Sequence, residues 1–488
     1  MENHILLIRT YVPVGIGGPI PPMELLYSAS QIEKEFGNSY PLKIVDMGIG
    51  DLSESDIQAE IESLNPKFIL LHAMAWEAQP VHNIASLAKN HNPHTKVIVL
   101  GQLATLAKDY LVADPNIDFV VVGEPELTIK DLLSALENRR DCSQVNGLVY
   151  EKDGVVIMTK ERVYPHDLDS IEISSLSWDL IDVKAYARYA NWNGALKENF
   201  YFPILTSRGC PFPCTFCLET YDKQFRARSP QNVIAEIKFL QDKYKVKEIH
   251  IFDAVFNYNN QRAKDICQAI IDAGIKVSLA FPHGIRADIM TDDLIDLLKK
   301  AGTYKVVYGV EAGSLRIQKL IKKNLNLSHV KEVIRKTSAA GILTGGYFML
   351  GFATETEEEM DQTIDFAVNS DLDIASFFKA TEYNDILEIY RTKDRKNAPL
   401  NFQDVSYYSV KRSMARVSSS ELNAMIFKAQ RKFYLSPKRL LRGFCKYPHK
   451  LSYLKNILNA SGLMLQAYLI QSLEMEGKEK DLALQKTS

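Results

Sequence analysis

The stretch Ser207-Arg208-Gly209-Cys210-Pro211-Phe212-Pro213-Cys214-Thr215-Phe216-Cys217 is the most informative part of the chain. Three thiols lie within eight residues, and the two prolines between them favour a tight loop. Such a loop can direct its sulfurs at one soft metal centre. An iron–sulfur cube held by three thiolates keeps one iron for a ligand that is not protein, whereas an electron carrier normally uses four cysteines.

A structural zinc site and three chance cysteines are the alternatives. Zinc in a structural site takes four ligands, and no further His or Cys lies close to the loop on either side. The nearest candidates, His250 and Cys267, fall within a predicted strand and a predicted helix. The spacing therefore favours an iron–sulfur cluster.

The pattern Cys-x3-Cys-x2-Cys, with the aromatic Phe216 before the last cysteine, resembles the radical S-adenosylmethionine (SAM) family. The resemblance implies that Cys210, Cys214 and Cys217 bind a [4Fe-4S] cluster. It also implies that the free iron holds the amino and carboxylate groups of SAM, and that the reduced cluster cleaves SAM to a 5′-deoxyadenosyl radical. An external electron donor of the flavodoxin or ferredoxin type belongs to this expectation.

Composition and charge are those of an ordinary globular protein. The 488 residues predict two to four domains, with 46% hydrophobic and 24% charged residues. The net charge of −2 suggests no nucleic-acid partner. The amino terminus lacks the basic start of a signal peptide, and the six cysteines do not form a disulfide framework. We therefore expect a cytoplasmic protein, whose reducing surroundings an oxygen-sensitive cluster requires.

Residues 1–140 alternate short apolar runs with amphipathic stretches, which is typical of βαβ units and a parallel sheet. Five strands with intervening helices predict a flavodoxin-like doubly wound α/β domain. Its ligand should lie at the carboxyl ends of the strands. The expected strands are His4–Thr10, Leu42–Met47, Phe68–Met74, Lys96–Leu100 and Phe119–Val122.

Three turns of this region resemble the cobalamin-binding domain that precedes the barrel in one branch of the radical SAM family. They are the Pro13–Pro22 loop with Pro21-Pro22 opening a helix, Gly101 after the fourth strand, and Gly123-Glu124-Pro125-Glu126 after the fifth. Gln102 stands where that branch commonly has a second glycine. The resemblance implies that Gly101, Gly123 and Glu124 contact cobalamin.

No Asp-x-His-x-x-Gly motif is present, which implies cobalt without a histidine of the protein below it. The alternative for this domain is a structural Rossmann-like fold that binds nothing. His72, near the end of the third strand, either faces a ligand or is an ordinary packed residue.

Residues 141–200 are predicted to form a connector. Val145–Tyr150 and Val155–Thr159 predict a hairpin around an Asp-Gly turn. An irregular segment follows, in which Trp178 and Trp192 are interpreted as packing groups.

Residues 201–395 resume the strand–helix alternation at a spacing that suits a partial (β/α)6 TIM-like barrel, the fold of the radical SAM family. Helices are expected between the strands, among them Gln231–Tyr244 and Glu357–Val368. The expected strands are Phe202–Thr206, Glu248–Phe252, Lys276–Phe281, Tyr304–Val310, Gly346–Leu350 and Ile374–Lys379.

Functional groups of such barrels come from the carboxyl ends of strands. The resemblance implies that Asp253 lies near the amino group of SAM, that Glu311 and Ser314 contact its polar ends and ribose, that Arg286 lines the pocket, and that Phe216 covers the adenine. Asp253 and Glu311 could equally be helix caps or surface ion pairs. Candidate substrate-pocket groups, each of which could be an ordinary wall residue, are His283, Tyr308, Tyr347 and Tyr383.

Residues 396–488 predict a helical region with a charged tail, and Glu421–Tyr434 is its clearest amphipathic helix. Between residues 431 and 473 basic and aromatic side chains precede a largely apolar stretch. This pattern fits peripheral contact with an anionic membrane, and it equally fits a helix packed on the barrel.

The motifs together favour a radical SAM enzyme of the cobalamin-binding branch. The expected activity is methyl transfer to an unactivated carbon of a lipid or natural-product substrate, and a tetrapyrrole is also open. One alternative is a cyclase or rearrangement enzyme of the same branch. The other is a non-catalytic iron–sulfur redox protein, which would have a fourth protein ligand.

Overall fold

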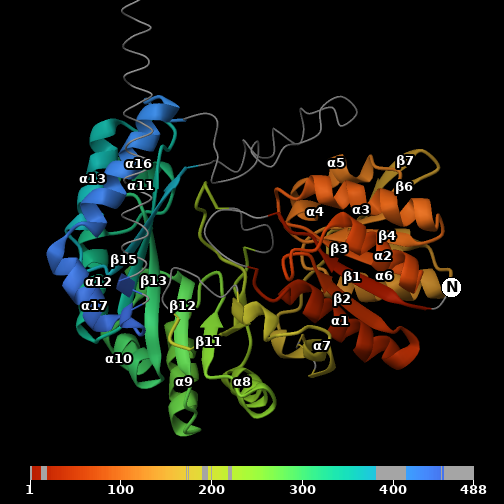
Figure 1. Ribbon diagram of the computed structural model, residues 1–488, viewed down its shortest axis with the longest axis horizontal. Helices are drawn as coiled ribbons and strands as arrows, with labels where there is room; N and C mark the ends of the chain where they lie inside the picture. Colours follow the sequence, from red (N-terminus) through yellow and green to blue (C-terminus); the bar gives the residue numbers. More distant parts are fainter. Residues whose placement is uncertain are drawn as a thin grey trace, which may run out of the picture.

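A computed structural model of the chain describes residues 3–12, 19–171, 173, 175–188, 196–198, 200–217, 223–380, 414–451 and 453–454. Two α/β units lie beside each other, the N-terminal unit on the right and the barrel on the left of Figure 1. The predicted fold class is confirmed, since the first unit is a doubly wound sheet, the second a parallel partial barrel, and the last described elements are helices.

The N-terminal unit has the strand order of a flavodoxin-like sheet. Its parallel strands run in the order β2-β1-β3-β4-β5, with β1 paired to both β2 and β3. All five predicted strands are present, with ends that differ by up to two residues. The elements are β1 (Ile5–Arg9), α1 (Met23–Phe36), β2 (Leu42–Asp46), α2 (Glu54–Leu64), β3 (Phe68–His72), α3 (Ala78–His91), β4 (Lys96–Leu100), α4 (Gln102–Leu106), α5 (Lys108–Val112), β5 (Phe119–Val121) and α6 (Glu126–Glu137).

Both faces of this sheet are covered, which explains why the central residues of its strands are apolar on both faces. In β1, Ile5 and Leu7 pack against the layer that contains α1 and α6. The alternate residues Leu6 and Ile8 pack against the layer that contains α2 and α3. A continuous apolar strand is what a doubly covered parallel sheet requires.

The predicted hairpin forms, but it extends the N-terminal sheet instead of lying in a separate connector. The strands β6 (Leu148–Lys152) and β7 (Val155–Met158) pair with each other, and β6 pairs antiparallel with β5. Leu148 and Tyr150 are buried in the same core as α6. The burial of these two side chains stabilises the hairpin as part of the N-terminal sheet.

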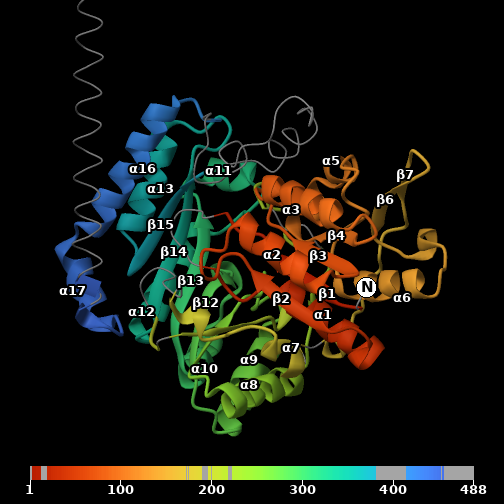
Figure 2. The same ribbon diagram turned by 45° about the vertical axis from the view of Figure 1, so that its right-hand side comes forward.

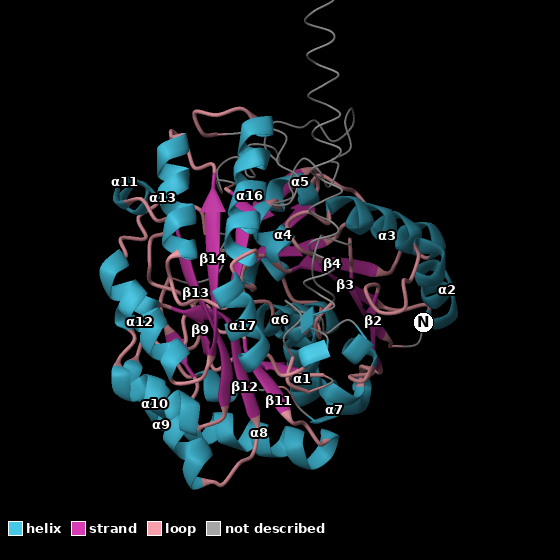
Figure 3. Cartoon of the chain, turned by 60° about the vertical axis from the view of Figure 1, so that its left-hand side comes forward, coloured by secondary structure: helices cyan, strands magenta, loops and turns pink. Residues whose placement is uncertain are grey.

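The second unit is an open barrel of six parallel strands in the order β15-β14-β13-β12-β11-β8. Figures 2 and 3 show its helices on the outer side of the curved sheet. All six predicted strands are present. The elements are β8 (Phe202–Ile204), α8 (Pro230–Tyr244), β11 (Glu248–Ile251), α9 (Asn260–Asp272), β12 (Ser278–Ile285), α10 (Asp292–Lys300), β13 (Thr303–Glu311), α11 (Leu315–Leu320), α12 (Leu327–Ala339), β14 (Leu343–Leu350), α13 (Glu357–Val368) and β15 (Ile374–Lys379).

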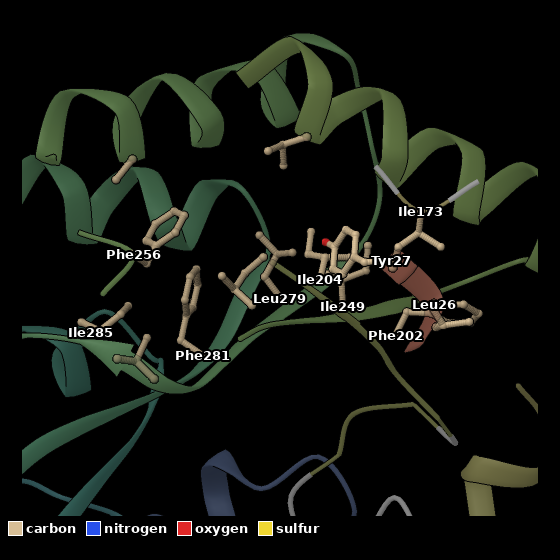
Figure 4. Close-up of a cluster of buried hydrophobic side chains, with 14 of the residues drawn as sticks. Leu26, Tyr27, Ile173, Phe202, Ile204, Ile249, Phe256, Leu279, Phe281 and Ile285 are labelled. Atoms are coloured by element: carbon tan, nitrogen blue, oxygen red, sulfur yellow. The ribbon is translucent and has the colours of Figure 1, made fainter. Parts of the chain in front are cut away.

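One apolar core joins the two units. Leu26 and Tyr27 of α1 lie beside Phe202 and Ile204 of the barrel (Figure 4). Trp178, in the short helix α7 (Ser175–Asp179), is fully buried, and its ring centroid lies 5.0 Å from that of Phe202. Its interpretation as a packing group is confirmed, whereas Trp192 lies outside the described residues.

Two C-terminal helices complete the described chain, α16 (Ser419–Tyr434) and α17 (Pro437–Lys446). The helix α16 packs on β15 and α13. Its bounds are close to those of the predicted helix Glu421–Tyr434. The helix α17 binds the barrel through its basic residues, because Arg439 donates to the carbonyls of Leu372 and Phe433, and Arg442 and Lys446 bind Asp373. No helix among the described residues is long and apolar enough to cross a membrane.

Candidate functional site

A cavity of about 550 Å³ lies where the carboxyl ends of the two sheets face each other. From the N-terminal unit, the start of α1 and the turn after β5 contribute to its wall. From the barrel, the cysteine loop after β8 and the ends of β11, β12 and β13 contribute. This is the position that both fold types favour for a ligand.

The three cysteines of the loop all line this cavity. The loop is held to the barrel by the amide of Thr215, which donates to the carbonyl of Ile321 at 3.1 Å. Cys142, Cys267 and Cys445 are not among the lining residues. Within the described ranges, no group of three His, Cys, Asp or Glu side chains could hold a single metal ion. The three thiols of the loop therefore share one cavity.

Two aromatic rings of the loop meet cationic side chains of the cavity wall. The Arg286 guanidinium lies 3.7 Å from the centroid of the Phe212 ring, and it also binds Asp288 at 2.9 Å. Phe216 lies beside Phe352, with Lys323 5.8 Å from its ring centroid. Phe216 and Arg286 therefore both line the cavity.

Glu311, at the end of β13, also lines the cavity and forms an ion pair with Lys323 at 3.1 Å. Its φ of 68° is in the left-handed region, which non-glycine residues rarely adopt and which often marks functional sites. Gly309 makes room for this pair, because a Cβ there would lie 2.7 Å from Glu311 Oε1 and 3.0 Å from Lys323 Nζ. Both charged side chains are about nine-tenths buried.

Asp253 is turned away from the cavity. Its carboxylate accepts hydrogen bonds from the Thr206 amide at 2.6 Å, the Thr206 hydroxyl at 2.5 Å and the Ser207 hydroxyl at 2.6 Å. It is fully buried and is not a lining residue, although its neighbours Phe252 and Ala254 are. Its observed contacts fix the end of β8, from which the cysteine loop starts.

Ser314 and Tyr308 are also engaged elsewhere. The Ser314 hydroxyl caps α11 by accepting from the Ile317 amide, and it donates to Glu359. Tyr308 is fully buried, with its hydroxyl bonded to that of Thr337 in α12. Tyr383 lies outside the described residues.

His283 and Tyr347 both line the cavity. Burial lowers the pKa of the His283 imidazole, although a hydrogen bond to the Asp253 carbonyl opposes this shift. The Tyr347 hydroxyl donates to the carbonyl of Pro282 at 2.8 Å. These two residues are therefore the described substrate-pocket candidates.

Gly101 allows a close approach between two strand ends of the N-terminal sheet. A Cβ there would lie 2.9 Å from the Ala73 carbonyl and 3.0 Å from the His72 ring, and its φ is 91°. His72 Nε2 lies 3.1 Å from Glu24, a cavity residue at the start of α1. The Gln102 side chain accepts from the Ala75 amide at 3.2 Å, which ties it to the loop after β3.

The turn Gly123–Glu126 faces the barrel. Glu124 lines the cavity and accepts from Arg208 at 3.0 Å and from Arg226, while Glu126 accepts from Arg208 at 2.8 Å. Gly123 lies against the Tyr164 hydroxyl, which a Cβ would approach to 1.7 Å. The observed partners of Glu124 are thus arginines of the protein.

Lys323, Arg208 and Arg226 were not identified as site residues from the sequence, and Glu126 was identified only as part of the turn after the fifth strand. The position of Arg208 directly before Gly209-Cys210 is a sequence signal that could have identified it as a residue of the site. Lys323 lies twelve residues from Glu311 and Arg226 is distant from Glu124, and no local pattern marks such pairs.

Comparison with protein families matches two parts of the chain. Residues 10–133 match the model of the B12 binding domain, and residues 204–367 match that of the radical SAM superfamily. A [4Fe-4S] cluster and SAM are the cofactors of such a barrel, and cobalamin is that of such an N-terminal domain.

The chain is 30% identical over 431 residues to an uncharacterised methyltransferase of Pyrococcus horikoshii, covering 88% of this chain and 90% of the relative. It is 25% identical to the anaerobic magnesium-protoporphyrin IX monomethyl ester cyclase of Rubrivivax gelatinosus, covering 91% and 79%.

Among solved structures, the radical SAM methyltransferase TsrM of Kitasatospora setae, with cobalamin and a [4Fe-4S] cluster bound, has a similar fold. The TM-score is 0.63 at 18% identity, covering 78% of this chain and 72% of TsrM. The extent of the first sequence match and the two domain matches establish the family. The chain belongs to the radical SAM superfamily, among the enzymes whose barrel follows a B12-binding domain.

Proposed function

We propose that this enzyme is a cobalamin-dependent methyltransferase that acts on an unactivated carbon of a small-molecule substrate. The observation that carries the proposal is the shared cavity, in which three cysteines, an ion pair and two aromatic rings of the barrel face the strand ends of the B12-binding domain. One cavity between two cofactor domains is what a reaction that uses both cofactors needs.

In this proposal Cys210, Cys214 and Cys217 hold the cluster and leave one iron open. The bound cofactors supply the reactivity, a SAM-derived radical from the cluster site and a methyl group from cobalamin. Lys323 and Arg286 are the cations suited to the carboxylate of SAM, and Glu311 suits its ammonium group. Phe216 offers an apolar ring for the adenine.

Asp253 and Ser314 hold the surrounding backbone in this scheme, given their observed hydrogen bonds. Gly101, Gly123 and Glu124 stand at the strand ends proposed for cobalamin. Gly101 suits that place because it lets the ends of β3 and β4 come close together. Gln102 fits as well, since its side chain is bonded to the Ala75 amide.

A lipid or natural product remains the proposed substrate, with His283 and Tyr347 as wall residues. A flavodoxin or ferredoxin is the proposed electron donor. Peripheral membrane contact through residues 431–473 is the weaker part of the proposal. Arg439, Arg442 and Lys446 are engaged with the barrel, and residues 455–473 lie outside the described residues.

The test uses anaerobically reconstituted protein with dithionite and SAM carrying a deuterated methyl group. The proposal expects 5′-deoxyadenosine in the wild type and none in Cys214→Ala. Extracts of cells lacking the gene, added as a source of substrate, should yield a metabolite that carries the deuterated methyl. Wild-type protein that forms no 5′-deoxyadenosine would refute the proposal.

A cyclase is the second candidate, favoured by the likeness to the Rubrivivax enzyme. The same experiment separates the two. A cyclase forms 5′-deoxyadenosine and changes a metabolite without transferring the labelled methyl.

A further inference from the structure

The neck of the cysteine loop carries two like charges directly opposite each other. The loop leaves the barrel through β9 (Ser207–Arg208) and returns through β10 (Arg226–Ala227), and these strands pair antiparallel with Arg208 facing Arg226. Like charges at facing positions of an antiparallel pair repel and destabilise the pair. A two-residue ladder has few backbone hydrogen bonds with which to offset that repulsion.

The counter-charges come from the other domain. Glu124 Oε2 lies 3.0 Å from Arg208 Nη1 and 3.2 Å from Arg226 Nη1, and Glu124 Oε1 contacts Arg226 Nη2. Glu126 Oε1 lies 2.8 Å from Arg208 Nη2. The Arg226 side chain is completely buried and that of Arg208 nearly so. Buried charges of this kind are stable only when they are paired.

Two aromatic rings complete the enclosure of the arginines. The Arg208 guanidinium lies 4.6 Å from the ring centroid of Tyr27 in α1, and that of Arg226 lies 5.0 Å from the Tyr164 ring. The Tyr164 hydroxyl accepts from the Glu124 amide at 3.2 Å, in the space that the absent side chain of Gly123 leaves. The contacts of the neck arginines therefore come from Tyr27, Glu124 and Glu126 of the B12-binding domain and from Tyr164 in the segment after β7.

We infer that Glu124 and Glu126 are positioning residues that hold the cluster loop closed through Arg208 and Arg226. The neck is electrostatically complete only when the two domains are docked, so cluster retention depends on the B12-binding domain. The inference rests on the proposed cluster site at the loop. It gives Glu124 a role that does not require contact with cobalamin.

The test compares iron release to a chelator from anaerobic holoenzyme in Glu124→Gln, Arg226→Gln and the double variant. Glu124→Gln removes the carboxylate that bridges the two facing guanidinium groups, while Glu126 still binds Arg208, and iron release should accelerate at least about tenfold. Arg226→Gln removes one of the facing charges, so it should have a small effect alone and should restore slow release in the double variant. Cobalamin content should stay at the wild-type level in all three.

Asp131→Asn is the matched control, because it breaks the partly buried Arg162 pair within the N-terminal domain and should leave iron release unchanged. Gel filtration and circular dichroism identify any variant that fails to fold, and Glu126→Gln then replaces Glu124→Gln, with a smaller acceleration expected.

Hydrogen exchange of the neck amides in cluster-free protein keeps the test independent of the proposed function. These amides should exchange faster in Glu124→Gln even if the wild type binds no cluster, a result that would refute the proposed function alone. Unchanged neck exchange and iron release, or a double variant worse than Glu124→Gln, would overturn the inference. Loss of cobalamin with normal iron retention would overturn it too and make Glu124 a cofactor ligand.

Discussion

The strand ends of the two sheets differ in what their polar groups bind. In the N-terminal sheet they bind the protein itself, since buried Glu77 accepts from the Thr10 hydroxyl and the Met74 amide, and Gln102 accepts from the Ala75 amide. In the barrel, Glu311 and Arg286 pair with Lys323 and Asp288 and also line the cavity together with the three cysteines. The topology of both sheets predicts a ligand at the carboxyl ends of their strands. The hydrogen bonds of each polar side chain then determine whether it lines the cavity.

The largest expected effect is on SAM binding, from a change to the ion pair at the cavity end of β13. Lys323→Met leaves the buried Glu311 carboxylate at the end of β13 without its ion-pair cation. Disrupting a buried charge pair costs about 2–5 kcal/mol, so the dissociation constant for SAM should rise at least about 30-fold in equilibrium binding. Lys336→Met is the control, because it removes an exposed ion pair with Asp292 that lies outside the cavity. Equal SAM affinity in both variants would contradict the assigned role of the ion pair.

Asp253 tests whether a polar group at the end of a barrel strand can serve the fold and not a ligand. Asp253→Ala leaves three donors of Thr206 and Ser207 without their acceptor, and the free energy of unfolding should fall by about 3 kcal/mol in denaturant titration. Ser314→Ala, which removes a helix cap, should cost only about 1 kcal/mol. Weakened SAM binding with unchanged stability in Asp253→Ala would show that its carboxylate is a ligand.

Glu355, after β14, predicts a pH dependence of stability. Its Oε2 accepts from the amides of Gly351 and Phe352, and burial raises its pKa to about 7. Because the folded state holds this proton more tightly than the unfolded chain, the contribution is complete below about pH 4.5 and is lost as the pH rises through about 7. Glu355→Gln should remove this loss and gain up to about 3 kcal/mol above pH 7. If the free energy of unfolding of the wild type and of Glu355→Gln depended on pH in the same way, the raised pKa of Glu355 would be contradicted.

The smallest effect concerns the turn after β14. Thr354 has a φ of 63°, in the left-handed region, where a side chain is strained. Thr354→Gly should raise the free energy of unfolding by about 0.5–1 kcal/mol, measured by thermal and chemical unfolding. The Thr354 carbonyl keeps its bond from Arg316, so a loss of stability would mean that the lost hydroxyl contact with Arg316 outweighs the strain.

Strand positions and strand order follow from local patterns that the sequence shows directly. Every strand of the two parallel sheets was expected within a few residues, because apolar runs and turn residues recur at regular spacing. The cysteine loop was recognisable for the same reason, because its three cysteines are neighbours in sequence. The hairpin joined the N-terminal sheet because its inward side chains complete the core of α6, a contact that a local pattern does not reveal.

The direction of individual side chains could not be predicted in the same way. Asp253 and Glu311 both follow buried strands, yet one bonds to β8 and its adjoining residues while the other takes a left-handed φ and lines the cavity. Arg208, Arg226 and Lys323 have partners that are distant in sequence. The contacts of Arg208 and Arg226 depend on the packing of two domains, and that of Lys323 depends on the packing within the barrel, neither of which a local sequence pattern displays.

The central claim is that three cysteines hold a cluster whose fourth iron is open to SAM. Electron paramagnetic resonance of the reduced protein, recorded with and without SAM, tests it most directly. The account predicts a cluster signal that changes when SAM is added and is absent in Cys214→Ala. A signal that is unaffected by SAM, or that shows a fourth ligand from the protein, would contradict it.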